Sequence, residues 1–197
     1  MPTVSCACPP INPQKYGTNV PLKKYPPPPP PTTAVAVAAA AGDAAALEMA
    51  LDTASPEEIC GVGGDGGGEN TPLVWAAESG DERCVQLLLE RGAGSKLFDV
   101  DALGYLEATA VSRAARLGHV GVLDRLLQAG ANPNIPNIKS QYPLHFAGFK
   151  LKHEAVDVLL RHGASTLVLD RKGRTPAEDT SSDAIREAIL AARAGAA

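Results

Sequence analysis

Apolar and polar positions follow a helical period in three stretches of the chain that also resemble one another. The stretches are "NTPLVWAAESGDERCVQLLLERGA" (Asn70–Ala93), "ATAVSRAARLGHVGVLDRLLQAGA" (Ala108–Ala131) and "QYPLHFAGFKLKHEAVDVLLRHGA" (Gln141–Ala164). Each has a pair of small residues, then a glycine or its replacement, then a leucine-rich segment that closes on Gly-Ala. The closing glycines Gly130 and Gly163 are 33 residues apart, and Gly92 precedes Gly130 by 38 residues. Self-similarity at this period is typical of a stacked solenoid.

Each unit is expected to fold as two helices. In the first unit, Thr71 can cap a helix N-terminus and Pro72 suits its first turn. Gly80 is expected to end this helix. The second helix carries apolar residues at i, i+3 and i+4 in the segment 85–89, which predicts one buried stripe. Gly92 is expected to end it in the left-handed conformation.

These units resemble the ankyrin repeat, whose motif runs D-x-x-G-x-T-P-L-H-x-A-A, then G-H, then L-L and G-A. The resemblance is carried by "TPLVWAA" with "LLLERGA", by "PLHFA" with "LLRHGA", and by "DRKGRTP" (Asp170–Pro176). It implies an all-α solenoid of stacked helix-turn-helix units with hairpin fingers. It also implies that His145, at the T-P-L-H position, hydrogen-bonds between neighbouring repeats, and that His119 has the equivalent structural role at the G-H position.

The predicted organisation is a disordered proline-rich arm at 1–32, an ankyrin repeat domain at 33–193 and a tail at 194–197. Within the domain we expect an N-terminal end unit at 33–56, a glycine-rich insertion at 57–69, repeats at 70–104, 105–136 and 137–169, and a C-terminal end unit at 170–193. Atypical end units are expected because each presents one face to water. Several positions depart from the pattern. Ala110 and Val111 replace proline and leucine, Arg113 replaces an apolar residue, Tyr142 replaces the capping threonine, and Leu151 replaces the glycine that ends the first helix.

The stretch "GVGGDGGGENTPL" (Gly61–Leu73) contains a G-x-G-x-x-G spacing at Gly61, Gly63 and Gly66, which in dinucleotide enzymes cradles a pyrophosphate. Such a loop must follow a strand and open a helix within a βαβ unit. Here it follows a helical segment and precedes a Thr-Pro helix start that belongs to a repeat. We therefore interpret it as an insertion at a finger, and we predict no cofactor.

Candidate chemistry is otherwise weak. His153 and Asp157 are four residues apart and His162 follows, a spacing that a metal could use, but no cysteine or second motif accompanies them. The sequence has no G-x-S-x-G, H-E-x-x-H or P-loop motif. We predict neither a metal site nor an enzyme.

The composition and charge further restrict the class of protein. Hydrophobic residues make up 45% of the chain, many of them alanine, and aromatic residues 4%, which suits a fold that spreads its burial along a line. The net charge of −4 argues against nonspecific nucleic-acid binding, although the segment 137–174 carries seven basic and three acidic residues. No apolar run approaches the ~20 residues of a membrane span. Cys6, Cys8, Cys60 and Cys84 have no zinc spacing and are expected to be reduced thiols of an intracellular protein, cytoplasmic or nuclear, and a monomer when alone.

The resemblance also implies a function: an adaptor or scaffold that binds a partner protein on the concave face made by the first helices and the fingers. Carried over residue by residue, the partner-facing positions are Asn70, Glu78, Ser79, Tyr105, Leu106, Arg116, Leu117, Ile138, Lys139, Gln141, Phe149, Lys150, Arg171, Lys172 and Arg174. This set begins acidic and becomes apolar and basic. It predicts an acidic partner segment with at least one apolar residue, although the charges would also serve simply to solvate the fingers.

The proline-rich arm offers a second hypothesis. Lys23, Pro26 and Pro29 fit a basic P-x-x-P ligand for SH3-type grooves, and the run Pro26–Pro31 would also suit WW, EVH1 or profilin domains. A stiff spacer is the alternative interpretation. A different class of function, an organelle-targeted accessory or assembly subunit, would use the arm as its address or anchor.

Overall fold

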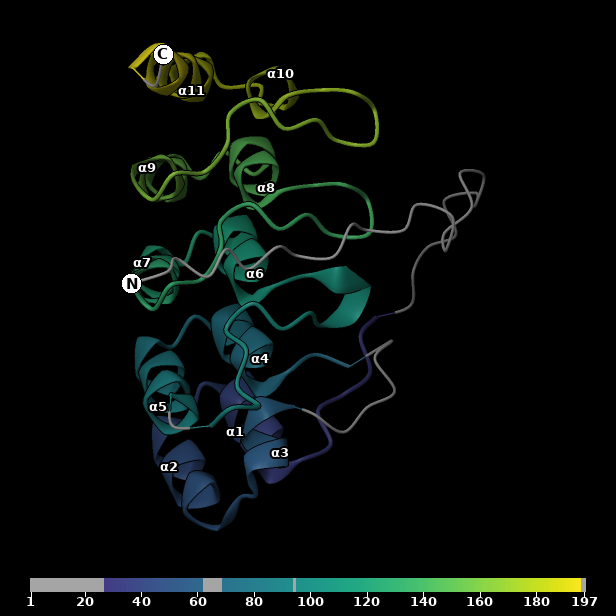
Figure 1. Cartoon of the computed structure of the whole chain (residues 1–197), viewed down its shortest axis with the longest axis vertical. Coiled ribbons are helices and arrows are strands. Elements are labelled where there is room, and N and C mark those ends of the chain that lie inside the picture. The colour runs from purple at the N-terminus through teal and green to yellow at the C-terminus, as the bar shows by residue number, and fades with distance from the viewer. Residues whose placement is uncertain (1–26, 62–68, 94, 196–197) are drawn as a thin grey trace, which may run out of the picture.

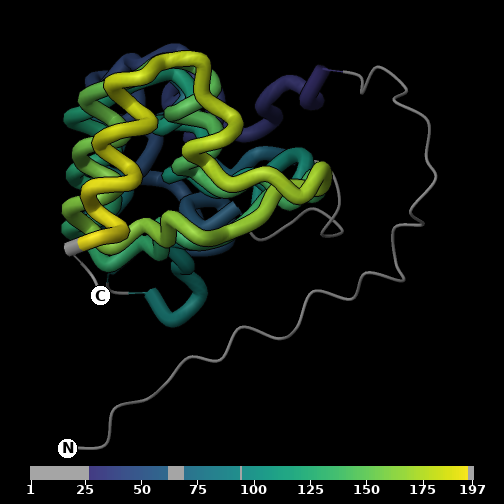
Figure 2. Tube along the Cα trace, turned by 90° about the horizontal axis from the view of Figure 1, so that it is seen from above, coloured from purple at the N-terminus to yellow at the C-terminus, as the bar shows by residue number. Residues whose placement is uncertain are grey.

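The helices stack in two parallel layers, with hairpin fingers projecting from one side (Figures 1 and 2). The computed structural model describes residues 27–61, 69–93 and 95–195, and all regular structure within these ranges is helical. The inner helices are α1 (Ala34–Ala41), α4 (Pro72–Ser79), α6 (Ala110–Leu117), α8 (Pro143–Phe149) and α10 (Pro176–Asp179). The outer helices are α2 (Ala44–Thr53), α5 (Glu82–Gly92), α7 (Val120–Gln128), α9 (His153–Arg161) and α11 (Asp183–Gly195). The predicted all-α solenoid is confirmed.

Each helix packs on its counterpart in the next unit, so the core is a continuous seam between the layers. The outer helices contribute leucines such as Leu47, Leu88, Leu123 and Leu159, none of which has any solvent exposure. The inner helices contribute alanines where they meet, together with larger residues such as Leu73 and Leu144. Because no unit buries its apolar stripe by itself, stacking supplies most of the stability.

Local sequence sets the start of the inner helices. Thr33, Thr71 and Thr109 occupy the same position, and each side-chain oxygen accepts the backbone N–H three residues on, at 3.1–3.2 Å. This interaction satisfies one of the unpaired donors at a helix N-terminus. Tyr142 cannot make it, and α8 begins without a side-chain cap. The helix keeps its place because Pro143 and Leu144 are buried against its neighbours.

The glycine prediction holds at the ends of the inner helices and is wrong at Gly92. Gly80 and Gly118 both end helices with φ of 82°. Gly92 instead remains helical as the last residue of α5. The interval from Gly92 to Gly130 is five residues longer than the one from Gly130 to Gly163. This inserted loop after Gly92 brings the ring of Phe98 against it, where any side chain would collide with the ring. This position therefore requires glycine because of its small size, and not because of a positive φ.

Two element boundaries differ from those expected. A short helix, α3 (Pro56–Cys60), lies across the predicted start of the insertion, and Ser55 with Glu58 forms a capping box that starts it. At the other end α11 continues through Gly195. Most of the glycine-rich stretch (62–68) and of the arm (1–26) lies outside the described residues.

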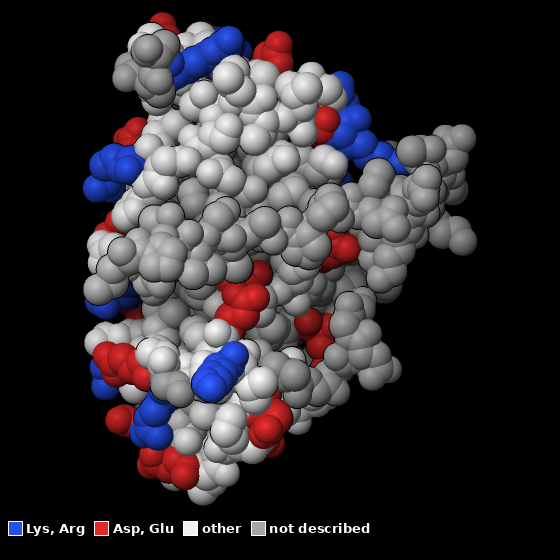
Figure 3. All heavy atoms as spheres, viewed as in Figure 1, with Lys and Arg blue, Asp and Glu red and all other residues white. Residues whose placement is uncertain are grey.

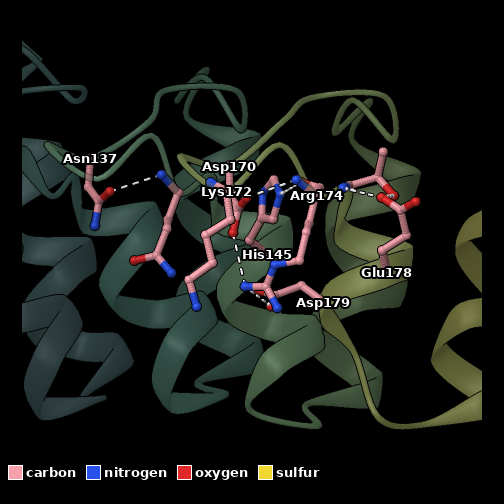
Figure 4. Close-up of polar contacts among 9 residues, drawn as sticks. Asn137, His145, Asp170, Lys172, Arg174, Glu178 and Asp179 are labelled. Atoms are coloured by element: carbon pink, nitrogen blue, oxygen red, sulfur yellow. Dashed lines mark hydrogen bonds and ion pairs between the residues drawn. The ribbon is translucent and has the colours of Figure 1, made fainter. Parts of the chain in front are cut away.

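The last two fingers are built on one acceptor each (Figure 4). The Oδ1 atom of Asn137 accepts the backbone N–H groups of Lys139 and Gln141, at 2.9 and 3.0 Å. Asp170 occupies the equivalent position in the next unit. Its Oδ1 accepts the N–H groups of residues 172 and 174, at 2.8 and 2.9 Å. One side-chain oxygen therefore closes the turn of each finger.

His145 joins its unit to the finger of the next unit, as the family resemblance implied. Its Nε2 atom lies 3.0 Å from the carbonyl oxygen of Arg174, in the finger of the following unit. The guanidinium of Arg174 in turn contacts Asp170 at 3.0 Å and Asp179 at 2.5 Å, and both of these carboxylates are buried (Figure 4). Burial raises the pKa of Asp170, but the hydrogen bonds from Arg174 and from the N–H of Lys172 outweigh it and hold the pKa below its usual range.

We predict that Asp170→Asn is milder than Asp170→Ala. Asparagine keeps both backbone hydrogen bonds, as Asn137 does, and loses only the ion pair with Arg174. The expected losses in free energy of unfolding are about 1 kcal/mol for asparagine and about 2–3 kcal/mol for alanine, measured by urea denaturation at pH 7.

The same carboxylate predicts an acid dependence. Because the folded-state pKa lies below the unfolded value of about 4, ionised Asp170 stabilises the fold above that pH. The contribution is lost as the pH falls through the folded-state pKa, so the difference between wild type and Asp170→Asn should shrink in acid. Equal losses for both variants at pH 7 would show that the finger hydrogen bonds contribute little.

Candidate partner-binding face

The predicted partner-facing residues form columns that run along the solenoid. Glu78, Arg116 and Phe149 hold the same position at the ends of α4, α6 and α8, and Ser79, Leu117 and Lys150 hold the next one. On the fingers, the columns are Tyr105, Ile138 and Arg171, then Leu106, Lys139 and Lys172. Because successive inner helices and fingers lie side by side (Figure 1), these columns share the concave face.

The N-terminal end of this face is occupied by intramolecular contacts. Glu78 is half-buried and its Oε1 lies 3.8 Å from Nη1 of Arg113. The hydroxyl of Ser79 donates to the carbonyl of Ala76 at 2.9 Å. The prediction that Asn70 faces a partner is wrong, because this residue is only 6% exposed.

Asn70 instead builds the finger of the following unit. That finger has Gly104 at the position of Asn137 and Asp170, so it lacks an acceptor side chain of its own. The Oδ1 atom of Asn70 reaches across and accepts the N–H of Tyr105 at 2.9 Å. Gly104 is required there, since a side chain would collide with Asn70.

The same finger, called the second finger below, also receives a hydrogen bond from Arg113 on the inner helix α6. Its Nη2 donates to the carbonyl of Tyr105 at 3.3 Å, while Nη1 faces Glu78. Leu106 and Glu107 at the tip adopt positive φ, 61° and 57°, and the carbonyl of Leu106 accepts the N–H of Ile138 at 3.2 Å. Backbone hydrogen bonds already close this turn, and Arg113, which departs from the repeat pattern, adds a side-chain contact to it.

Arg113 is an unusual group for this place because it is only 7% exposed. Burial lowers the pKa of its guanidinium from the ordinary value, while the charge of Glu78 opposes that shift. The Nε atom of Arg113 and the Oε2 atom of Glu78 have no hydrogen-bond partner among the described residues. The pair is therefore held in place with its polar atoms incompletely satisfied.

The C-terminal half of the face is more open. Phe149 is 58% exposed, and Nζ of Lys150 lies 5.4 Å from the centre of its ring, a cation–π contact. Arg171 and Lys172 are exposed on the last finger, where basic side chains gather in Figure 3. The remaining predicted positions, Arg116, Leu117, Ile138, Lys139 and Gln141, are half-buried. Arg174 is held by its two aspartates.

The other candidates lie apart from this face. His162 is turned toward α7, where its Nε2 lies 3.0 Å from Asp124, and the described residues contain no group of three or more potential metal ligands. No helix in the described ranges is long and apolar enough to cross a membrane. Of the proposed proline ligand, Lys23 and Pro26 lie outside the described residues. Pro29 is described and lines a pocket with Trp75.

Sequence reasoning missed three interactions: the contact of Asn70 with the next finger, the Arg113–Glu78 pair, and the ion pair of Asp179 with Arg174. The first two had a signal. A glycine at the finger-acceptor position and an arginine at an apolar position occur in the same unit.

We predict that Arg113→Met destabilises the chain by about 1–3 kcal/mol, because it removes the ion-pair partner of the half-buried Glu78 and one of the hydrogen bonds that the carbonyl of Tyr105 accepts. The double variant Arg113→Met/Glu78→Gln should lose less than the sum of the single variants. Chemical denaturation of the four proteins measures this coupling. Strictly additive losses would show that the two side chains do not interact.

The comparisons with known proteins agree with this geometry. A family model described as ankyrin repeats (3 copies) matches residues 35–137. The matched segment spans α1 to α7 and makes up more than half of the chain, and the same stacking continues beyond it through α11. None of the curated proteins compared with the chain matches it. On the strength of the family match and the stacked helix pairs, the chain belongs to the ankyrin repeat family.

Proposed function

We propose that this chain is a non-enzymatic adaptor or scaffold that holds a partner protein on its concave face. Ankyrin repeats are generally protein–protein interaction modules, and the family is typically non-enzymatic. The observation that carries the proposal is Phe149, a large aromatic side chain left 58% exposed on an inner helix. Aromatic side chains supply much of the binding energy at protein interfaces.

The charges around Phe149 define the chemistry of the partner. Lys150 covers one side of the ring, and Arg171 and Lys172 extend the basic rim along the fingers. Glu78 at the opposite end is neutralised by Arg113. The face therefore favours an acidic segment whose apolar residue packs on Phe149. Basic groups at the rim mainly increase the rate of association and fix the orientation.

The test is affinity capture from an extract of the source cells, with wild type beside Phe149→Ala/Lys172→Glu. We expect a set of proteins to be retained by wild type and lost, at least tenfold, with the variant, because the anchor and part of the rim are removed. Quantitative mass spectrometry of the retained proteins measures the loss, and a binding assay with each purified candidate confirms direct contact.

The matched control is Leu190→Ala/Arg193→Glu. It also removes one exposed apolar and one basic side chain, but from the outer helix α11. All variants should first show the melting temperature of wild type. If the control loses the same proteins, or if the concave variant retains all of them, the concave face is not the working surface.

A further inference from the structure

One residue at the edge of the concave face is held in a conformation that its side chain disfavours. Leu151 follows α8 with φ of 56°. In three other units the equivalent position is glycine, namely Gly42, Gly80 and Gly118, with φ of 68°, 82° and 82°. The left-handed conformation brings a side chain close to its own backbone, so glycine adopts it readily and leucine at a cost.

The turn after α8 requires a left-handed residue at position 151. The N–H of Lys152 donates to the carbonyl of Ala147 at 2.9 Å, just as the N–H of His119 donates to Ala114 at 3.0 Å. These bonds close the C-terminus of the inner helix and require a left-handed residue between them. The fold therefore demands glycine geometry at this position, and the chain supplies leucine.

Packing does not compensate for the strain, because Leu151 is 46% exposed. It stands two residues after the exposed Phe149 and borders a shallow hollow between the loops of the second and third units. The hollow is lined by Gly118, Val120, Leu151, Lys152, His153, Glu154 and Ala155. A strained residue that gains little from its own fold is a reason to look for a function.

The charge of this loop differs from that of its counterparts. The residue after the left-handed position is Asp43 in the N-terminal end unit, Asp81 in the first repeat, His119 in the second and Lys152 in the third. Lys150 stands on the other side of Leu151. The exposed leucine is thus flanked by two lysines. They outnumber the one acidic residue that lines the hollow, Glu154, and complement an acidic segment.

We propose that Leu151 is a second apolar anchor for the partner, and this inference rests on the function proposed above. The occupant is an acidic segment with two bulky apolar side chains. One packs on Phe149 in the concave face, and the other enters the hollow beside Leu151 as the segment crosses the edge between α8 and α9. The lysines on both sides of Leu151 contact its carboxylates.

The probe is a displayed library of 16-residue peptides rich in aspartate and glutamate, with randomised positions drawn from leucine, phenylalanine, tryptophan, alanine and lysine. Peptides are selected on the wild-type chain, and the dissociation constant of the tightest binder is measured by fluorescence polarisation. We expect two bulky apolar positions to be selected. Selection of peptides with none, or no selection at all, would overturn the proposal.

The decisive variants are Leu151→Gly and Leu151→Asn, since both residues tolerate positive φ and neither offers an apolar surface. We expect each to raise the melting temperature by about 2–4 °C, because strain is relieved, and to weaken peptide binding about tenfold. Leu151→Met keeps both the strain and the apolar surface and should bind as wild type does. Stability and affinity therefore move in opposite directions, which a purely structural role for Leu151 would not produce.

Phe149→Ala separates this inference from the proposed function. If Phe149→Ala abolishes binding while Leu151→Gly binds as wild type, the concave face is the site and the anchor at the edge is wrong. If neither variant affects binding, both proposals fail. An unchanged or lower melting temperature for Leu151→Gly and Leu151→Asn would refute the argument from strain.

Discussion

The close approach of adjacent inner helices is the constraint on which the rest of the molecule depends. It requires small residues where the helices meet, and Ala76, Ala77, Ala114, Ala115 and Ala147 have no solvent exposure. Side chains of ordinary size would push the units apart and open the leucine seam behind them. The same spacing sets successive fingers side by side and aligns equivalent positions into columns. A surface for a partner is therefore a direct consequence of how the core packs.

The fingers face a second constraint, because a tight turn leaves backbone N–H groups that need acceptors. Asn137 and Asp170 meet this need within their own units. The second finger has only Gly104 at this position, and Asn70 supplies the acceptor from the preceding unit. Arg113 donates a further hydrogen bond to the carbonyl of Tyr105 in this finger. The missing acceptor is thus replaced by Asn70 of the preceding unit, and stacking stabilises local structure as well as the core.

Most of the fold could be predicted from the sequence because it depends on short-range signals. Threonine caps, alanine pairs and leucine stripes recur in each unit, and His145 follows directly from its motif. The errors at Gly92 and Asn70 have a common physical cause. Phe98 lies in the inserted loop, and Gly104 and Tyr105 lie where that loop returns to the finger. Each therefore makes contacts that no repeat pattern contains. The repeat pattern predicts which positions form the columns of the candidate face. It does not predict which of these residues already make intramolecular contacts, because those depend on the side chains around them.

Arg113 and Leu151 both break the repeat pattern, yet they do so for different reasons. Arg113 is buried, pairs with Glu78 and donates to the finger at the carbonyl of Tyr105, so its departure is explained within the fold. Leu151 is exposed, strained and flanked by lysines, and no intramolecular contact among those described accounts for it. Where each local rule of a fold agrees with the others, an unexplained violation at the surface points to selection for something outside the fold. That difference is why the edge at Leu151, and not the buried arginine, is assigned to the partner.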